Sequence, residues 1–149
     1  MKRSATPSFV LTLKLNTSKE DERILADRFF SGWKIYNTLV RHVRKAFRSM
    51  HQDPNYRDAM NRYHEDGKSK AVKKELSDIR NQYGLSEYAL HKYVKLQQKR
   101  YAADIDSLTA QKIASQVWQA VEDVLFDSGK QVHFRKWKDF SSLEGKNNQ

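Results

Sequence analysis

The feature that most constrains this chain is a long run in which an apolar side chain recurs every three or four residues. That spacing places the apolar side chains on one face of an α-helix. The positions are Leu25, Phe29, Trp33, Tyr36, Val40, Val43 and Phe47. Thr17 and Glu20 form a capping-box pattern before this run, and Asp21 and Glu22 follow where the helix dipole favours negative charge. We therefore expect one helix that starts after Thr17 and continues to about Met50.

Basic side chains of the same segment lie away from its apolar face. Lys34, Arg41, Lys45 and Arg48 fall roughly 100° around the helix from the apolar stripe. A helix of this kind packs through one face and leaves a second face free to hold phosphate groups.

Four shorter helices are expected downstream. Pro54 opens a short one that Gly67 closes, and a second runs from about Ser69 to Tyr83, with Gly84 as its C-terminal cap. Ser86 caps the next helix. Its apolar face carries Leu90, Val94 and Tyr101, and the nearly opposite face carries Lys92, Lys95 and Lys99.

The last predicted helix, Thr109 to Phe126, has a broad apolar surface and few basic residues. We expect it to occupy the centre of the helical block, with Gly129 ending it. Trp33 and Tyr36 of the first helix are assigned to the same core.

Two segments outside the helical block have strand character. From Phe9 to Leu15 apolar side chains alternate with polar or smaller ones, and Val132, Phe134 and Trp137 recur in a β-prone tail that also carries Arg135 and Lys136. We expect the first strand to pair with the last in a sheet that lacks further partners. The predicted fold class is α+β, mostly α, with a helical bundle inserted between strands.

The charge of the chain favours a polyanionic partner. The sequence has 28 basic and 18 acidic side chains, a formal net charge of +10. Residues 1–50 carry 11 basic and 4 acidic side chains, whereas residues 101–149 carry 6 and 7. A basic region joined to a near-neutral one indicates a surface that faces nucleic acid. The alternative is a lysine-rich surface that only aids solubility.

Other classes of site find little support. Cysteine is absent, which excludes a disulfide or thiolate zinc site within the chain. The five histidines have no metal-ligand spacing, the five glycines are isolated, and the carboxylates sit mainly at helix ends. We therefore expect no catalytic residue, metal or cofactor here. The basic start MKRSATPSF has no apolar stretch behind it, so a cytoplasmic protein without a membrane span is expected.

Three segments, in this order and spacing, resemble the N-terminal region of the TnpB (OrfB) proteins of bacterial insertion sequences, relatives of type V CRISPR effectors. SFVLTLKL is similar to the family's first strand, SGWKIYNTLV to its helix with Tyr36 and Asn37, and SGKQVHFRKWKDFSSLEGK to its return to the sheet. The resemblance implies a first strand of a wedge β-barrel at 1–16, a helical recognition lobe at 17–128 and truncated return strands at 129–149.

The resemblance also implies partners and binding residues. They are a guide RNA and a target DNA in the bacterial cytoplasm and nucleoid, with the RuvC nuclease and zinc ribbon lying beyond residue 149. YGLSEYALHKY places Tyr83, and SLTAQKIASQVWQAV places Ser107 and Gln111, at positions that contact a short target-adjacent DNA motif. The family often has Lys where Ser107 stands. Gln111 is expected in the first turn of the last helix, and its amide has the donor and acceptor that pair with the edge of adenine.

Two other functions stay open at this point. One is a helical protein-interaction module, and the other is a DNA-binding transposase domain that works without RNA. RNA that co-purifies with the chain would separate the RNA-guided function from both.

Overall fold

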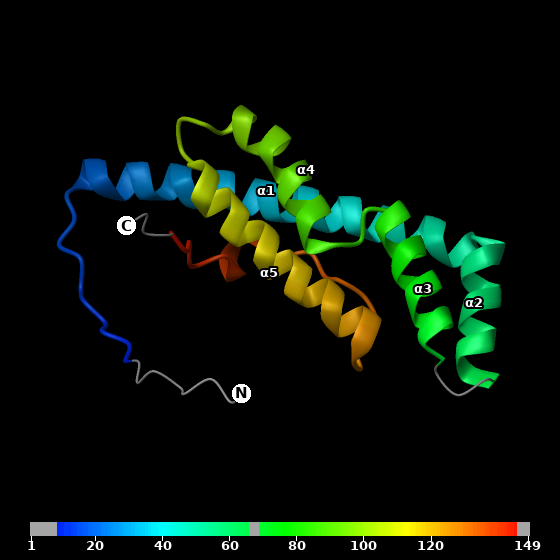
Figure 1. Ribbon diagram of the computed structural model, residues 1–149. Helices are drawn as coiled ribbons and strands as arrows, with labels where there is room; N and C mark the ends of the chain where they lie inside the picture. Colours follow the sequence, from blue (N-terminus) through cyan, green and yellow to red (C-terminus); the bar gives the residue numbers. More distant parts are fainter. Residues whose placement is uncertain (1–8, 66–68, 146–149) are drawn as a thin grey trace.

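The computed structural model describes residues 9–65 and 69–145, and Figure 1 shows helices preceded by an extended arm and followed by an irregular tail. The elements are α1 (Lys19–Gln52), α2 (Pro54–Glu65), α3 (Lys70–Gln82), α4 (Glu87–Arg100), α5 (Ser107–Phe126) and the 3-10 turn η1 (Trp137–Asp139). Gly67, the predicted end of the second helix, lies outside the described residues.

The helix α1 is the long helix that the apolar repeat predicts. The capping box at its start forms one residue later than expected. The Ser18 hydroxyl accepts from the backbone N–H of Asp21 at 3.1 Å, and the Asp21 carboxylate accepts from the Ser18 N–H at 2.9 Å. The bond from the Ser18 N–H, and a second one that the Ser18 hydroxyl donates to the same carboxylate at 2.7 Å, lower the pKa of Asp21. The helix ends at Gln52, because a residue that precedes proline, here Asp53, disfavours the helical conformation.

The helices α2, α4 and α5 pack against α1, and α3 packs against α2. In Figure 1, α5 crosses α1 obliquely, α4 lies beside both, and α2 and α3 form a hairpin at the far end of α1. The last helix, α5, contacts both α1 and α4 and buries much of its apolar surface, whereas α1 contacts α2, α4 and α5 and so holds the central position predicted for the last helix. The largest fully buried side chains include Ile35, Leu39, Met50, Leu85, Leu90, Ile105 and Ile113.

Side-chain caps fix the starts of the later helices. The hydroxyls of Ser69 and Ser86 accept backbone N–H bonds at the first turns of α3 and α4, and the cap at Ser86 is the one that the sequence predicts. The α5 helix starts two residues earlier than expected, because the Asp106 carboxylate accepts from the N–H groups of Leu108 and Thr109. The bonds to Thr109 contribute most to lowering the pKa of Asp106.

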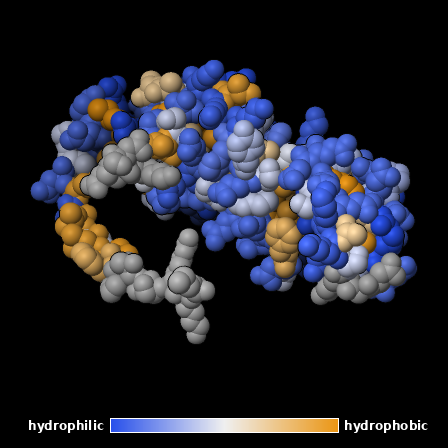
Figure 2. All heavy atoms as spheres, viewed as in Figure 1, coloured by the Kyte–Doolittle hydropathy of each residue, from blue (hydrophilic) through white to orange (hydrophobic). Residues whose placement is uncertain are grey.

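The prediction of an α+β fold with a partial wedge β-barrel is wrong for the residues that the structure describes, because none of them forms a strand. The segment Phe9–Leu15 is extended but exposed, and it does not pair with the tail. Figure 2 shows its apolar side chains standing apart from the largely hydrophilic helical body. Alternation fits a strand only where another strand offers a free edge.

The tail deviates from the prediction for a different reason. Val132 is buried, as expected for a core-facing position, but the backbone around Arg135 bonds to side chains of α1 rather than to a strand. Trp137 begins a 3-10 turn instead of continuing an extended segment. Among the described helices, none combines the length and apolarity needed to cross a membrane.

Gly84 provides a test of how α3 ends. Its φ of 73° lies in the left-handed region, and a Cβ built there meets no atom within 4 Å. Gly84→Ala should therefore lower the free energy of unfolding by about 1–2 kcal/mol through backbone strain alone, measured by urea denaturation. Gly145→Ala is the matched control, since a Cβ at Gly145 also meets nothing and its φ is ordinary. Equal losses in the two variants would contradict this account.

Candidate nucleic-acid interface

The first component of the candidate interface is the α1 basic ridge, which we define as Lys34, Arg41, Lys45 and Arg48. All four side chains are exposed. At the helical period the ridge lies on nearly the opposite side of α1 from the buried side chains of that helix. The predicted separation from the apolar stripe was therefore too small, and the ridge points away from the core. Residues 28–52 contain no acidic side chain.

A second ridge follows α4. Lys92, Lys95 and Lys99 are exposed on the side opposite the buried Leu90 and Val94, as the sequence predicts. Tyr88 and Leu96, which are 80% and 60% exposed, belong to the same outer side of the helix. The α4 ridge is therefore less strictly basic than the α1 ridge.

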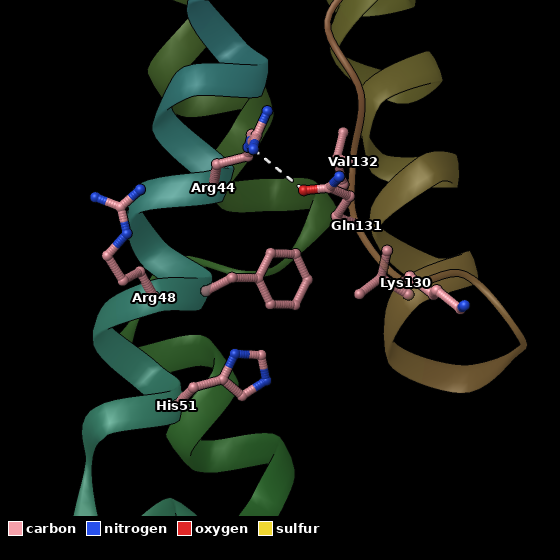
Figure 3. Close-up of a pocket in the computed structure, with 8 residues that line it drawn as sticks. Arg44, Arg48, His51, Lys130, Gln131 and Val132 are labelled. Atoms are coloured by element: carbon pink, nitrogen blue, oxygen red, sulfur yellow. Dashed lines mark hydrogen bonds between the residues drawn. The ribbon is translucent and has the colours of Figure 1, made fainter.

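The second component is the basic pocket, a cavity of about 210 Å³ between the second half of α1, the end of α5 and the tail (Figure 3). Arg44, Arg48, His51 and Lys130 are its basic or imidazole side chains. Phe47, Val124, Gln131 and Val132 complete the lining, so no carboxylate lines the pocket. Figure 3 shows Arg44 and His51 directed from α1 toward the tail, with Arg48 on the outer side of the helix. Arg48 thus joins the basic pocket to the α1 basic ridge.

Sequence analysis identified only Arg48 among these four residues. Arg44 was missed because it lies on the flank of α1 that faces the tail, and its neighbours there are distant in the sequence. The one indication of its role in the sequence was that the acid-free stretch 28–52 contains basic residues besides the four of the α1 basic ridge.

Arg44 is held in place by neutral groups. Its guanidinium donates to Oε1 of Gln131 at 3.1 Å and lies 5.1 Å from the ring centroid of Phe134. Within the described ranges none of Arg44, Arg48, His51 and Lys130 forms an ion pair with a carboxylate. The positive charge of the pocket is therefore not neutralised by neighbouring acids, which is the condition that attracts an anion.

The position of the tail depends on two side chains of α1. The Asn37 amide accepts from the Arg135 N–H at 2.9 Å and donates to the Arg135 carbonyl at 2.9 Å, and Nε1 of Trp33 donates to the same carbonyl at 2.7 Å. The asparagine thereby provides both hydrogen bonds that a neighbouring strand would have given this residue. The half-buried guanidinium of Arg135 rests over the Tyr36 ring at 4.3 Å, and Lys136 is exposed.

The residues placed by family resemblance are dispersed. The Tyr83 hydroxyl donates to the Asp53 carboxylate at 2.8 Å, which joins the ends of α1 and α3. Ser107 is the exposed first residue of α5, and Gln111 is half-buried in its second turn rather than its first. Among the described residues no hydrogen bond joins these three positions to one another.

The junction between α1 and α4 lies beside the α1 basic ridge. The imidazole of His42 stacks on Tyr93 with ring centroids 3.9 Å apart. Burial lowers the pKa of His42, and the positive charge of Lys45 lowers it further. The histidine therefore contributes to the packing of α1 against α4, and its lowered pKa makes it a weaker cation than an exposed histidine. In the residues that the structure describes, no group of three or more His, Cys, Asp or Glu gathers in a metal-binding arrangement.

Comparison of the chain with protein-family models, with curated proteins and with solved structures found no match. The geometry of the basic ridge and pocket is therefore the basis for a functional proposal.

The hydrogen bonds of Asn37 can be tested directly. Asn37→Ala removes both of its bonds to Arg135, so the free energy of unfolding should fall by about 1–3 kcal/mol and the Arg135 amide should exchange its hydrogen faster. Asn61→Ala on the exposed side of α2 is the matched control, since its side chain forms no hydrogen bond among the described residues. If hydrogen exchange at Arg135 were the same in both variants, Asn37 would not hold the tail.

Tyr83 also has a structural role that can be separated from any contact with DNA. Its hydrogen bond lowers the pKa of Asp53 in the folded chain. A lowered carboxyl pKa stabilises the folded chain at pH values above the pKa of Asp53 in the unfolded chain. This stabilisation is lost as the pH falls through the pKa of Asp53 in the folded chain. Tyr83→Phe should raise the Asp53 pKa toward its ordinary value, measured by NMR titration, and the destabilisation should vanish in acid. A variant with an unchanged Asp53 pKa would contradict this role.

Proposed function

We propose that this chain is a nucleic-acid-binding module whose main contact surface is the α1 basic ridge together with the adjoining basic pocket. The observation that carries the proposal is the accumulation of cations along the acid-free stretch 28–52 of α1, with Arg48 common to the ridge and the pocket. Lysine and arginine side chains that lack carboxylate partners bind phosphate groups with release of counterions. A phosphodiester backbone that runs along α1 could place successive phosphates beside successive basic side chains of the ridge.

The spacing of the ridge agrees with this chemistry. From Arg41 to Arg48 the axis of α1 advances about 10 Å, a length of duplex axis over which one strand carries about three phosphates. A surface whose charges only keep the protein soluble has positive and negative side chains interspersed. The α1 basic ridge instead presents one sign, and the neighbouring pocket repeats it.

Within this proposal, the resemblance to TnpB-type proteins supports the RNA-guided version of the function. The nucleic acids would then be a guide RNA and its target DNA, and Tyr83, Ser107 and Gln111 would be candidates for contact with the target-adjacent motif. The bound duplex would also reach the α4 ridge through Lys92, Lys95 and Lys99. Cleavage would belong to the RuvC and zinc-ribbon regions of the family, with which this chain would act.

The exposed arm favours a second candidate, a module that also engages protein. Phe9, Leu11 and Leu13 are 87%, 70% and 72% exposed. Exposure of this extent is unusual for a run of large apolar side chains in water. This observation concerns a different part of the molecule from the ridge, and it does not account for the uncompensated cations of α1.

The central experiment removes part of the ridge. In the triple variant Arg41→Gln, Lys45→Gln, Arg48→Gln, binding to every nucleic-acid sequence should weaken alike, since phosphate contacts carry no sequence information. The log–log salt dependence of the affinity should flatten by about 0.9 unit for each lost contact, measured by fluorescence anisotropy from low to high salt.

A charge-matched control separates the ridge from net charge. The triple variant Lys70→Gln, Lys73→Gln, Lys74→Gln removes the same charge from exposed positions of α3 and should keep most of the salt slope. Equal flattening in the two triple variants would show that the α1 basic ridge is not the contact surface. Sequencing the RNA that co-purifies with the chain then tests the RNA-guided version, because a DNA-binding transposase domain would retain no defined RNA.

A further inference from the structure

Three aromatic rings meet at the N-terminal side of the α1 basic ridge, in what we call the aromatic cluster: Phe30, Trp33 and Trp137. Their ring centroids are 5.7 to 5.8 Å apart in all three pairs, in tilted or edge-to-face arrangements. Phe30 and Trp33 belong to α1, and Trp137 belongs to η1 in the tail. The cluster therefore exists only in the folded chain.

The cluster is held in place and yet open to solvent. Trp33 is fixed by its hydrogen bond to the Arg135 carbonyl, two residues before Trp137. Phe30 and Trp137 nevertheless remain 46% and 45% exposed. Core packing alone would bury rings of this size, whereas a surface that binds planar ligands keeps them accessible.

Cationic side chains flank the cluster, although Glu22 lines a cavity together with Trp137 and Asp27 precedes Phe30 by one helical turn. The Lys34 ammonium lies 5.2 Å from the Phe30 ring centroid and 5.0 Å from that of Trp33. Lys136 and Lys138 flank Trp137 in the sequence and are exposed, and Asp139 is the acidic residue of the same turn. Lys34 is also the first residue of the α1 basic ridge, so rings and phosphate-binding charges are continuous along one helix.

We propose that the aromatic cluster stacks an unpaired base of a single-stranded segment while Lys34 and the tail lysines hold its phosphates. This inference rests on the proposed function and specifies its ligand as nucleic acid with unpaired bases. Bases inside a duplex have both faces covered by their neighbours, so away from duplex ends only an unpaired base offers a face to Trp137 or Phe30. Stacking of this kind tolerates any base, because every base has a π-face.

The test compares a 12-nucleotide oligouridylate with a blunt RNA duplex of the same length, using the full chain. The single strand should quench tryptophan fluorescence on binding, and Trp137→Ala should weaken its affinity by at least about fivefold. Duplex affinity should change less than twofold. Trp137→Phe, which keeps a ring, should retain most of the single-strand affinity.

Phe126→Ala serves as the matched control, because Phe126 is another exposed ring, 64% accessible, that lies beside Arg80 and away from the cluster. It should leave both affinities unchanged. Equal loss of single-strand and duplex binding in Trp137→Ala would show a structural role and overturn the inference. Unchanged single-strand binding would also overturn it and would assign the cluster to a protein partner. Failure of the unaltered chain to bind either RNA would instead overturn the proposed function.

Discussion

The arrangement of this protein depends on one pair of hydrogen bonds, those between the Asn37 amide and the backbone of Arg135. A buried or half-buried backbone group without a partner is costly, and the tail has no strand beside it among the described residues. Asn37 supplies a donor and an acceptor in the geometry of a strand edge, and Trp33 adds a second donor to the same carbonyl. The tail is therefore fixed along α1 by side chains of a helix rather than by a sheet.

The position of the tail determines both candidate binding surfaces. Upstream of Arg135, the tail brings Lys130 and Gln131 to the flank of α1 and so closes the basic pocket around Arg44. Downstream, it places Trp137 against Phe30 and Trp33. The α1 basic ridge lies between these two surfaces on the uncovered side of the helix. One long helix thus presents charge along its outer face, with a pocket and a ring cluster where the tail crosses it.

The helices could be predicted because their causes are local. Ser69 and Ser86 cap helices within one turn, Gly84 adopts the left-handed conformation that ends α3, and the apolar repeat of α1 determines its buried face. The two predicted strands are absent from the described residues, because the alternation from Phe9 to Leu15 shows only that the segment could pair and not that a partner strand lies beside it. Arg44 and Lys130 were missed for a similar reason: each is unremarkable in its own segment and becomes part of a pocket only beside the other segment.

The sequence alone determined the helices and their approximate limits, the charge of the chain and the acid-free stretch of α1, because caps, periodicity and composition act over a few residues. It also placed the α1 basic ridge, although not its full separation from the core. Only the tertiary structure decided that the tail lies along α1 without a sheet, that Arg44 and Lys130 line one pocket, and that Trp137 meets Phe30. These features join residues that are far apart in the chain, and which distant segments meet depends on how every helix packs, which no local pattern encodes.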